Sequence, residues 1–260
     1  MRPLFLLLLS VILASTIQAQ HHHDEELHFS HPLITESPSP DTKVRFDYFY
    51  RRFRPDRTSE HSPRVEFEYA FKPSFSVEVN LPYTVRRTED LPTVSHTDGM
   101  DVAVKLTNSV FKEHHVLLVY GVEFGLPTGS DSKGIGSGHL VEVAPYFGAG
   151  LKRAKVEVVG FTSVSVPANK RSGDEAATAL GYQLSFLFKP NPTIQPVIEL
   201  DGETELNGVG SGDTVVNLSP GIKLRPLRSE HWQLGAGVGF PVTSRKDFHT
   251  RVVLSAFYHF

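Results

Sequence analysis

The densest group of side chains able to coordinate a metal lies near the start of the chain. It consists of His21-His22-His23-Asp24-Glu25-Glu26, followed by His28 and His31. Imidazole and carboxylate groups together suit zinc, copper or nickel. A solvated polar tail has the same composition and is the simpler interpretation. We therefore expect a flexible N-terminal segment that binds metal weakly at most, and no dedicated metal site.

Two other motifs suggest chemistry that their surroundings do not support. Residues 134–138, GIGSG, have the glycine content of a phosphate-binding loop. They lack the Gly-Lys-Ser/Thr ending and no helical pattern follows, so no nucleotide site and no cofactor are predicted. A lipid-hydrolysing barrel would need an outward-facing Ser and His on adjacent strands, and His139, Ser163 and Ser165 supply no such pair. We expect that the chain is not an enzyme, and lipid hydrolysis is the least favoured alternative.

Charged side chains recur at every second position of several short segments, as in RVEFEYAF at 64–71. A charge facing lipid costs about 2–4 kcal/mol at the bilayer midplane. The alternate positions that carry charged side chains must therefore face the inside of a barrel. Two interpretations stay open, a closed interior of paired charges and a wet pore with a mild cation preference. The residues predicted to line the pore are Arg45, Asp47, Arg51, Arg64, Glu66, Glu68, Glu78, Asp101, Lys105, Glu123, Glu142, Glu199 and Arg251.

Strands must position these side chains, because polar and apolar residues alternate and no long helical period is present. Twelve segments fit, each long enough to cross a bilayer when tilted. The segments are 43–53, 64–72, 75–84, 99–108, 115–126, 139–150, 154–166, 176–188, 194–204, 213–225, 231–241 and 249–260. The predicted fold class is all-β, a transmembrane antiparallel up-and-down β-barrel of about twelve strands.

The connections between these segments alternate in length. The odd connections are 54–63, 85–98, 127–138, 167–175, 205–212 and 242–248, and each is longer than every even connection, namely 73–74, 109–114, 151–153, 189–193 and 226–230. Outer-membrane barrels have short periplasmic turns and long external loops. The pattern therefore predicts a barrel whose N-terminus is periplasmic.

The last segment shows the alternation most clearly. In RVVLSAFYHF at 251–260, every second residue from Val252 to Phe260 is apolar or aromatic. We predict that this strand closes the barrel by pairing with 43–53. A terminal aromatic strand resembles the signal that the barrel-assembly machinery recognises, which implies an assembly role for Tyr258 and Phe260.

The first residues have the layout of a secretory signal peptide. Arg2 precedes an apolar run that ends in small residues, and cleavage is predicted after Ala19. The predicted domains are a signal peptide at 1–19, a His/acid-rich periplasmic segment at 20–42 and an outer-membrane barrel at 43–260. This organisation predicts export to the outer membrane of a Gram-negative-type bacterium.

Composition narrows the partners. The chain has 26 Lys and Arg against 29 Asp and Glu, and this slightly acidic balance argues against nucleic acid. There is no cysteine, which excludes disulfides and thiol chemistry. The expected partners are outer-membrane lipids, the barrel-assembly machinery and small solutes.

Two short motifs resemble a known family. HPLITE at 31–36, followed by Pro40-Asp41-Thr42, and FGLPTG at 124–129 resemble the MetA-pathway phenol-degradation family of outer-membrane barrel transporters. The resemblance implies a porin-like passive channel or transporter for small solutes, and small organic or aromatic compounds follow from the family alone. The first alternative is a closed structural or adhesion barrel that uses external loops 85–98 and 127–138 for contacts, and a soluble periplasmic β-sandwich is the next.

Overall fold

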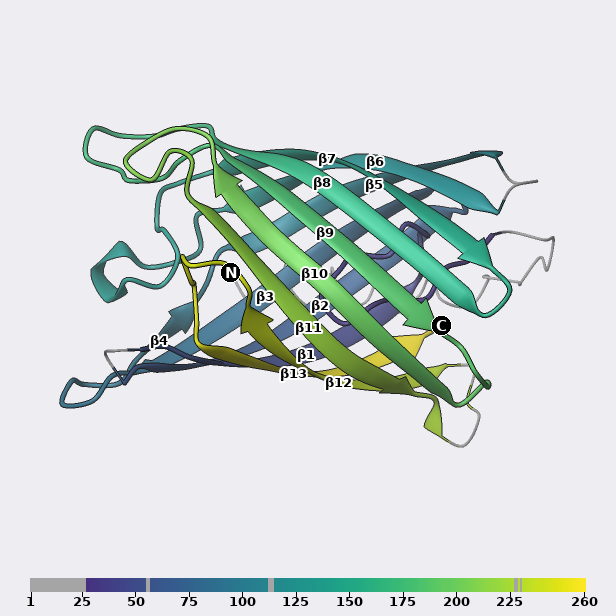
Figure 1. The fold of residues 1–260 in the computed structure, drawn as a ribbon. Helices are drawn as coiled ribbons and strands as arrows, with labels where there is room; N and C mark the ends of the chain where they lie inside the picture. Colours follow the sequence, from purple (N-terminus) through teal and green to yellow (C-terminus); the bar gives the residue numbers. More distant parts are fainter. Residues whose placement is uncertain (1–26, 55–56, 112–114, 227–228, 230) are drawn as a thin grey trace, which may run out of the picture.

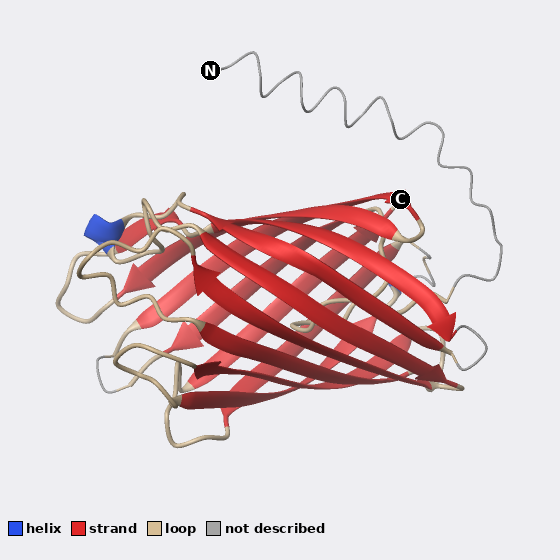
Figure 2. Cartoon of the chain, turned by 90° about the horizontal axis from the view of Figure 1, so that it is seen from above, coloured by secondary structure: helices blue, strands red, loops and turns tan. Residues whose placement is uncertain are grey.

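The computed structural model describes residues 27–54, 57–111, 115–226, 229 and 231–260. Within this part of the chain thirteen strands form one sheet. A 3-10 turn at Asp131–Lys133 is drawn in blue among the loops at one end of the molecule in Figure 2. No helix in the described ranges is both long and apolar enough to span a bilayer.

The strands follow one another along the chain with short gaps. They are β1 Lys43–Arg52, β2 Ser59–Lys72, β3 Phe75–Arg87, β4 Val94–Thr97, β5 Met100–Phe111, β6 Val116–Leu126, β7 Glu142–Arg153, β8 Val156–Pro167, β9 Ala179–Phe188, β10 Ile194–Glu205, β11 Thr214–Leu224, β12 Trp232–Pro241 and β13 Thr250–His259. Twelve of them form a closed antiparallel barrel, and β4 is an additional short strand at the side of β3.

The barrel closes where its first and last strands pair. β1 and β13 are antiparallel over their whole lengths, from Lys43 opposite His259 to Arg52 opposite Thr250. Every other barrel strand pairs with its neighbours in sequence, as Figure 1 shows. The predicted fold class, the number of barrel strands and the closing pair are therefore confirmed.

The bounds differ from the prediction at one end of the barrel. β2 and β3 extend to Ser59 and Arg87, which pair with each other, and β4 lies within the connection predicted at 85–98. These extensions carry polar residues on both faces because they lie beyond the apolar band, so alternation could not reveal them. The predicted length rule also has an exception, since connection 225–231 is no shorter than 53–58.

The outer face of the barrel is apolar. Phe46, Ile198 and Leu254 are each about half exposed, and the same holds for many Phe, Leu, Val and Ile residues on the outward parity of other strands. Soluble monomers rarely expose contiguous apolar patches above a few hundred Å². The surface is therefore typical of strands that face lipid.

The segment before β1 lies inside the barrel. Residues 27–42, called the N-terminal plug below, are drawn in purple within the wall of strands in Figure 1. Phe29, His31, Leu33 and Thr35 are all at least 99% buried. The expectation of a flexible periplasmic tail is therefore wrong for residues 27–42. His21 to Glu26 and the predicted signal peptide lie outside the described residues.

Candidate functional site

Two apolar side chains fix the plug against different parts of the wall. Leu33 packs in a buried cluster with residues of β1, β9, β10 and β13, namely Phe49, Leu187, Val197 and Val253. Phe29 packs against Leu117 of β6 and Val159 of β8. Burying one such side chain contributes about 1.5–3 kcal/mol. The plug therefore crosses the lumen from one side of the barrel to another.

Glycines on the inner wall make room for these anchors. A Cβ atom at Gly235 would lie 2.2 Å from Cδ2 of Leu33, and one at Gly150 would lie 2.7 Å from the ring of Phe29. Any side chain at either position would require the plug to move. The glycines thus serve the fit of the plug and do not simply widen the lumen.

Because the plug has no regular secondary structure, its buried backbone N–H groups need other acceptors. The carboxylate of Glu199 accepts three consecutive ones, from Leu33 at 3.0 Å, Ile34 at 3.0 Å and Thr35 at 2.8 Å. Glu157 accepts the N–H of Ser30 at 3.0 Å. Wall carboxylates therefore replace the partners that a sheet would give.

The wall also donates to plug carbonyl groups. The guanidinium of Arg45 donates to the carbonyl oxygen of Leu33, and the ammonium of Lys223 donates to that of His31. Hydrogen bonds that involve a charged group contribute about 1.5–3 kcal/mol each. Both faces of the plug backbone are thus held by charged side chains of the barrel.

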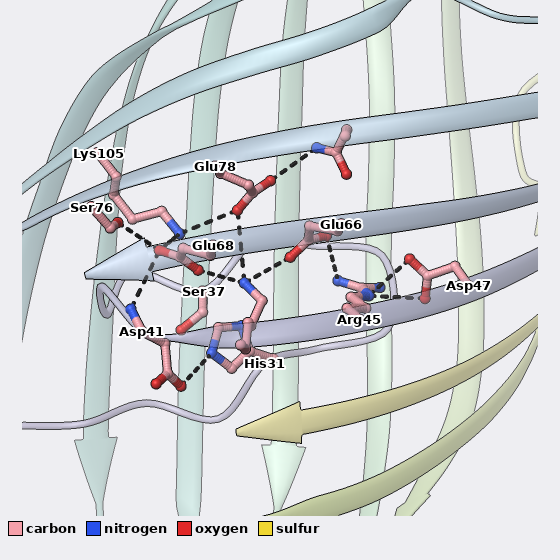
Figure 3. Close-up of polar contacts among 12 residues, drawn as sticks. His31, Ser37, Asp41, Arg45, Asp47, Glu66, Glu68, Ser76, Glu78 and Lys105 are labelled. Atoms are coloured by element: carbon pink, nitrogen blue, oxygen red, sulfur yellow. Dashed lines mark hydrogen bonds and ion pairs between the residues drawn. The ribbon is translucent and has the colours of Figure 1, made fainter. Parts of the chain in front are cut away.

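A layer of paired charges lies beside the plug on β1, β2, β3 and β5 (Figure 3). In this ionic layer Lys43 Nζ lies 2.7 Å from Glu66 and 2.5 Å from Glu68, and Lys105 Nζ lies 3.0 Å from Glu68. Removing one partner of a buried pair leaves an unpaired buried charge, which is costly. The four basic and four acidic members are Lys43, Arg45, Arg64, Lys105, Asp47, Glu66, Glu68 and Glu78.

Next to the plug the lumen contains a cavity of about 670 Å³. Ile34 and Glu36 of the plug line it together with residues from many strands. Its charged lining residues are eight acids and four bases: Glu36, Glu78, Asp98, Asp101, Glu123, Asp201, Glu203, Asp247, Arg51, Arg64, Lys105 and Arg251. The cavity is therefore acidic, although the ionic layer beside it is balanced.

Three of these acidic side chains form neither a hydrogen bond nor an ion pair in the described ranges. Within the described part of the chain no hydrogen bond or ion pair holds the carboxylates of Asp101, Glu123 and Glu203, whereas Asp201 is paired with Arg251 at 2.5 Å. Unpaired carboxylates attract cations into a cleft of low dielectric constant. The arrangement can therefore concentrate positively charged groups.

The thirteen residues predicted to line a pore lie in four kinds of surroundings, and Arg64, Glu78 and Lys105 belong both to the cavity lining and to the ionic layer. Arg51, Arg64, Glu78, Asp101, Lys105, Glu123 and Arg251 line the cavity. Arg45, Asp47, Glu66 and Glu68 lie in the ionic layer, and Glu199 lies against the plug. Glu142 accepts a hydrogen bond from Ser165 at 3.3 Å. The structure thus brings most of them together, and their role in a pore stays a prediction.

The sequence prediction missed the plug, although a signal for it exists. In 251–260 the inward parity also contains apolar residues, Val253 and Phe257, and both are completely buried. Apolar side chains on the lumen face of a water-filled barrel would be exposed. Their presence, together with the inward Phe49 and Val197, indicates that another apolar segment covers them.

At the end of the barrel with the short turns, three histidines surround Asp41. One carboxylate oxygen, Oδ2, lies 2.8 Å from Nδ1 of His259, 3.1 Å from Nε2 of His31 and 3.2 Å from Nε2 of His28. Although burial opposes it, these contacts hold the pKa of Asp41 far below its ordinary value. Burial and the ammonium of Lys43 lower the pKa of His31. His31 is therefore a neutral imidazole beside an ionised carboxylate.

The end with the long loops contains a second histidine cluster. His139 binds Asp174 through Nε2 at 3.0 Å and Asp131 through Nδ1 at 3.2 Å, which links connections 127–141 and 168–178. The hydrogen bonds to Asp174 and then to Asp131 raise the pKa of His139. Ser137 also contacts this imidazole, but its hydroxyl donates to Asp131 at 2.8 Å. This cluster therefore ties loops together and leaves no free nucleophile.

The fold is similar to that of solved outer-membrane channels. The COG4313 outer membrane channel from Pseudomonas putida F1 matches with a TM-score of 0.67 at 13% identity, covering 92% of this chain and 100% of that chain. The NanC porin matches with a TM-score of 0.57 at 9% identity, covering 84% and 98% of the two chains. For the KdgM porin the TM-score is 0.53 at 13% identity, covering 84% and 99%.

At these identities the similarity shows the fold alone. No family model matches the chain, and no curated protein matches it in sequence. The predicted resemblance to the MetA-pathway phenol-degradation family therefore stays a prediction.

Proposed function

We propose that this chain is an outer-membrane channel through which small solutes diffuse passively, and that the N-terminal plug holds it closed at rest. The observation that carries the proposal is the acidic cavity of about 670 Å³ inside a barrel with an apolar outer face. The apolar face fits a lipid bilayer, and the cavity offers a polar space within it. Neither feature requires a catalytic group, and we propose no enzymatic activity.

The acids without an ion-pair partner favour a channel over a purely structural barrel. Asp101, Glu123 and Glu203 face the cavity without a basic partner in the described ranges. A buried charge without a partner is costly unless water or a solute solvates it. A barrel with only a structural or adhesive role gains nothing from this arrangement, whereas a solute path does.

The plug is held in a way that permits movement. Its fixed points are two apolar anchors, Leu33 and Phe29, and hydrogen bonds to wall carboxylates and from wall cations. It pairs with no strand, so it can leave without breaking the sheet. Opening of the channel therefore requires local release of residues 27–42 and leaves the barrel intact.

The lining favours cationic or neutral solutes. The KdgM porin has been solved with oligogalacturonate, which is a polymer of acidic sugars. The cavity of this chain has twice as many acidic as basic side chains and would repel such a polymer. Phe49, Phe161 and Tyr182 line the same space, which supports small organic cations and neutral compounds with an apolar face.

Liposome swelling tests the proposal. Purified full-chain protein is reconstituted and exposed to neutral sugars of graded size and to organic cations and anions of matched size. Because a solute can pass only while the plug is transiently released, we expect slow swelling with small neutral and cationic solutes and still slower swelling with anions. No swelling with any solute, from protein that shows the heat-modifiable gel migration of a folded barrel, would favour the closed structural or adhesion barrel.

A further inference from the structure

Three ring nitrogens converge on a single oxygen at the short-turn end of the barrel. They belong to His28, His31 and His259, and each lies within 3.2 Å of Asp41 Oδ2. A carboxylate oxygen has two lone pairs, and Asp41 already accepts the N–H of Thr42 on its other oxygen. The imidazoles are thus more numerous than hydrogen bonding to this oxygen can satisfy.

We propose that His31, Asp41 and His259 form a binding site for a divalent transition-metal ion of the zinc type. Their ligand atoms all lie within 4.8 Å of one another. In a tetrahedral zinc site with bonds of about 2.0–2.1 Å, neighbouring ligand atoms are about 3.3 Å apart. The observed separations from Asp41 Oδ2, 2.8 Å and 3.1 Å, need an outward shift of only a few tenths of an ångström.

The surroundings suit a metal ligand set. The side chain of His31 is 1% exposed, that of His259 12% and that of Asp41 15%, so the ligands are fixed by packing but the site is reachable from the barrel end. Two imidazoles and one carboxylate are typical ligands of zinc and related ions. His28, whose side chain is 55% exposed, is the candidate for the fourth position.

The ligands come from distant parts of the chain. His31 and Asp41 belong to the plug, whereas His259 ends β13, 218 residues after Asp41. A bound ion would therefore tether the plug to the strand that closes the barrel. Binding itself does not depend on the channel function, but an effect of the ion on current rests on the proposed function above.

Cobalt(II) is the direct probe, because its visible spectrum reports the number and geometry of its ligands. Full-chain protein in detergent is titrated with cobalt and then with zinc as a competitor. We expect one tetrahedral cobalt site that zinc displaces. His259→Ala and Asp41→Asn should each weaken binding by about 100-fold, and His28→Ala by about 10-fold.

Two control variants separate this site from other histidines. His231→Ala removes a histidine at the same end, whose Nδ1 contacts the carbonyl oxygen of His259 at 2.8 Å. A triple variant, with His21, His22 and His23 changed to Ala, removes the predicted tail ligands. Both should retain the tetrahedral spectrum. The proposal is overturned if the spectrum is octahedral, or if the triple variant loses binding while folded His259→Ala and His31→Ala proteins keep it.

Discussion

The carboxylate of Glu199 accepts the backbone N–H of Thr35 at 2.8 Å, across 164 residues of sequence. The same carboxylate accepts the N–H groups of Leu33 and Ile34. A single side chain in the middle of β10 thus satisfies three consecutive donors of a segment without secondary structure. This contact makes Glu199 the principal polar anchor of the plug.

Glu199→Gln should loosen the plug. Glutamine keeps the shape but loses the charge and replaces one acceptor oxygen with an NH₂ group. We expect local opening to become easier by about 2 kcal/mol, so that amides of residues 33–35 exchange roughly 30-fold faster. Hydrogen exchange with mass spectrometry measures this. Glu203→Gln is the control, because Glu203 lies on the same strand and faces the cavity without contacting the plug; equal exchange in both variants would contradict the account.

The strands could be predicted from the sequence because each one carries its own signal. Lipid on one face and polar lumen on the other impose a period of two, and RVEFEYAF at 64–71 shows it without reference to any partner. The inward position of charges such as Glu66 and Arg251 follows from the same rule. Even the pairing of β1 with β13 follows once the barrel must close.

The plug and the histidine cluster depend on contacts between distant residues. Nothing near Asp41 in sequence indicates His259, and nothing near Leu33 indicates Gly235. β4 is equally hidden, since VSHT has no apolar alternation and is a strand only because it pairs with β3. The signal for the plug in the sequence is the presence of the apolar residues Val253 and Phe257 among the inward-facing positions of 251–260.

Removing the unpaired acids should reduce cation selectivity. In the double variant Asp101→Asn/Glu123→Gln, the cavity loses two carboxyl groups that form no hydrogen bond or ion pair in the described ranges. We expect the cation-to-anion permeability ratio to fall roughly two-fold. The reversal potential in a salt gradient measures the ratio. Glu89→Gln removes a carboxylate that pairs with exposed Arg57 outside the cavity, and it should leave the ratio unchanged.

The link between the long loops should depend on pH. The pKa of His139 is raised above its ordinary 6.5. The stability that protonated His139 gives to the contact between the two loops is therefore complete below pH 6.5, and it is lost as the pH rises through the raised value. The pKa values of Asp131 and Asp174 are lowered from 3.8, so their contribution is lost only in acid. NMR titration of His139 should give a pKa above 6.5, and Asp174→Asn should bring it down. An unchanged value in Asp174→Asn would refute the link.

The predicted assembly role of Phe260 can be tested separately from the stability of the pairing between β1 and β13. The N–H of Phe260 donates to the carbonyl oxygen of Thr42 at 3.0 Å, while the side chain is half exposed. Phe260→Ala keeps this hydrogen bond, and loss of an exposed side chain should hardly change the folded barrel. We therefore expect normal refolding in detergent but reduced assembly in cells, measured by recovery in the outer-membrane fraction. Normal assembly in cells would show that Phe260 is not part of the signal.

The central claim, that the plug closes a channel, can be tested by fixing the plug to the wall. The chain has no cysteine, so Leu33→Cys/Gly235→Cys introduces one defined pair. Cγ of Leu33, near which the sulfur of a cysteine would lie, is 3.7 Å from a Cβ atom at position 235, close to disulfide reach after a small shift. The two single-cysteine variants are the controls.

Planar-bilayer current is then recorded from the double variant before and after reduction, with the disulfide verified by mass spectrometry. The account predicts no current from the oxidised protein, and cation-selective openings from the reduced protein and from both single variants. Equal current in the oxidised and reduced states, or no current from any variant at any voltage, would contradict it.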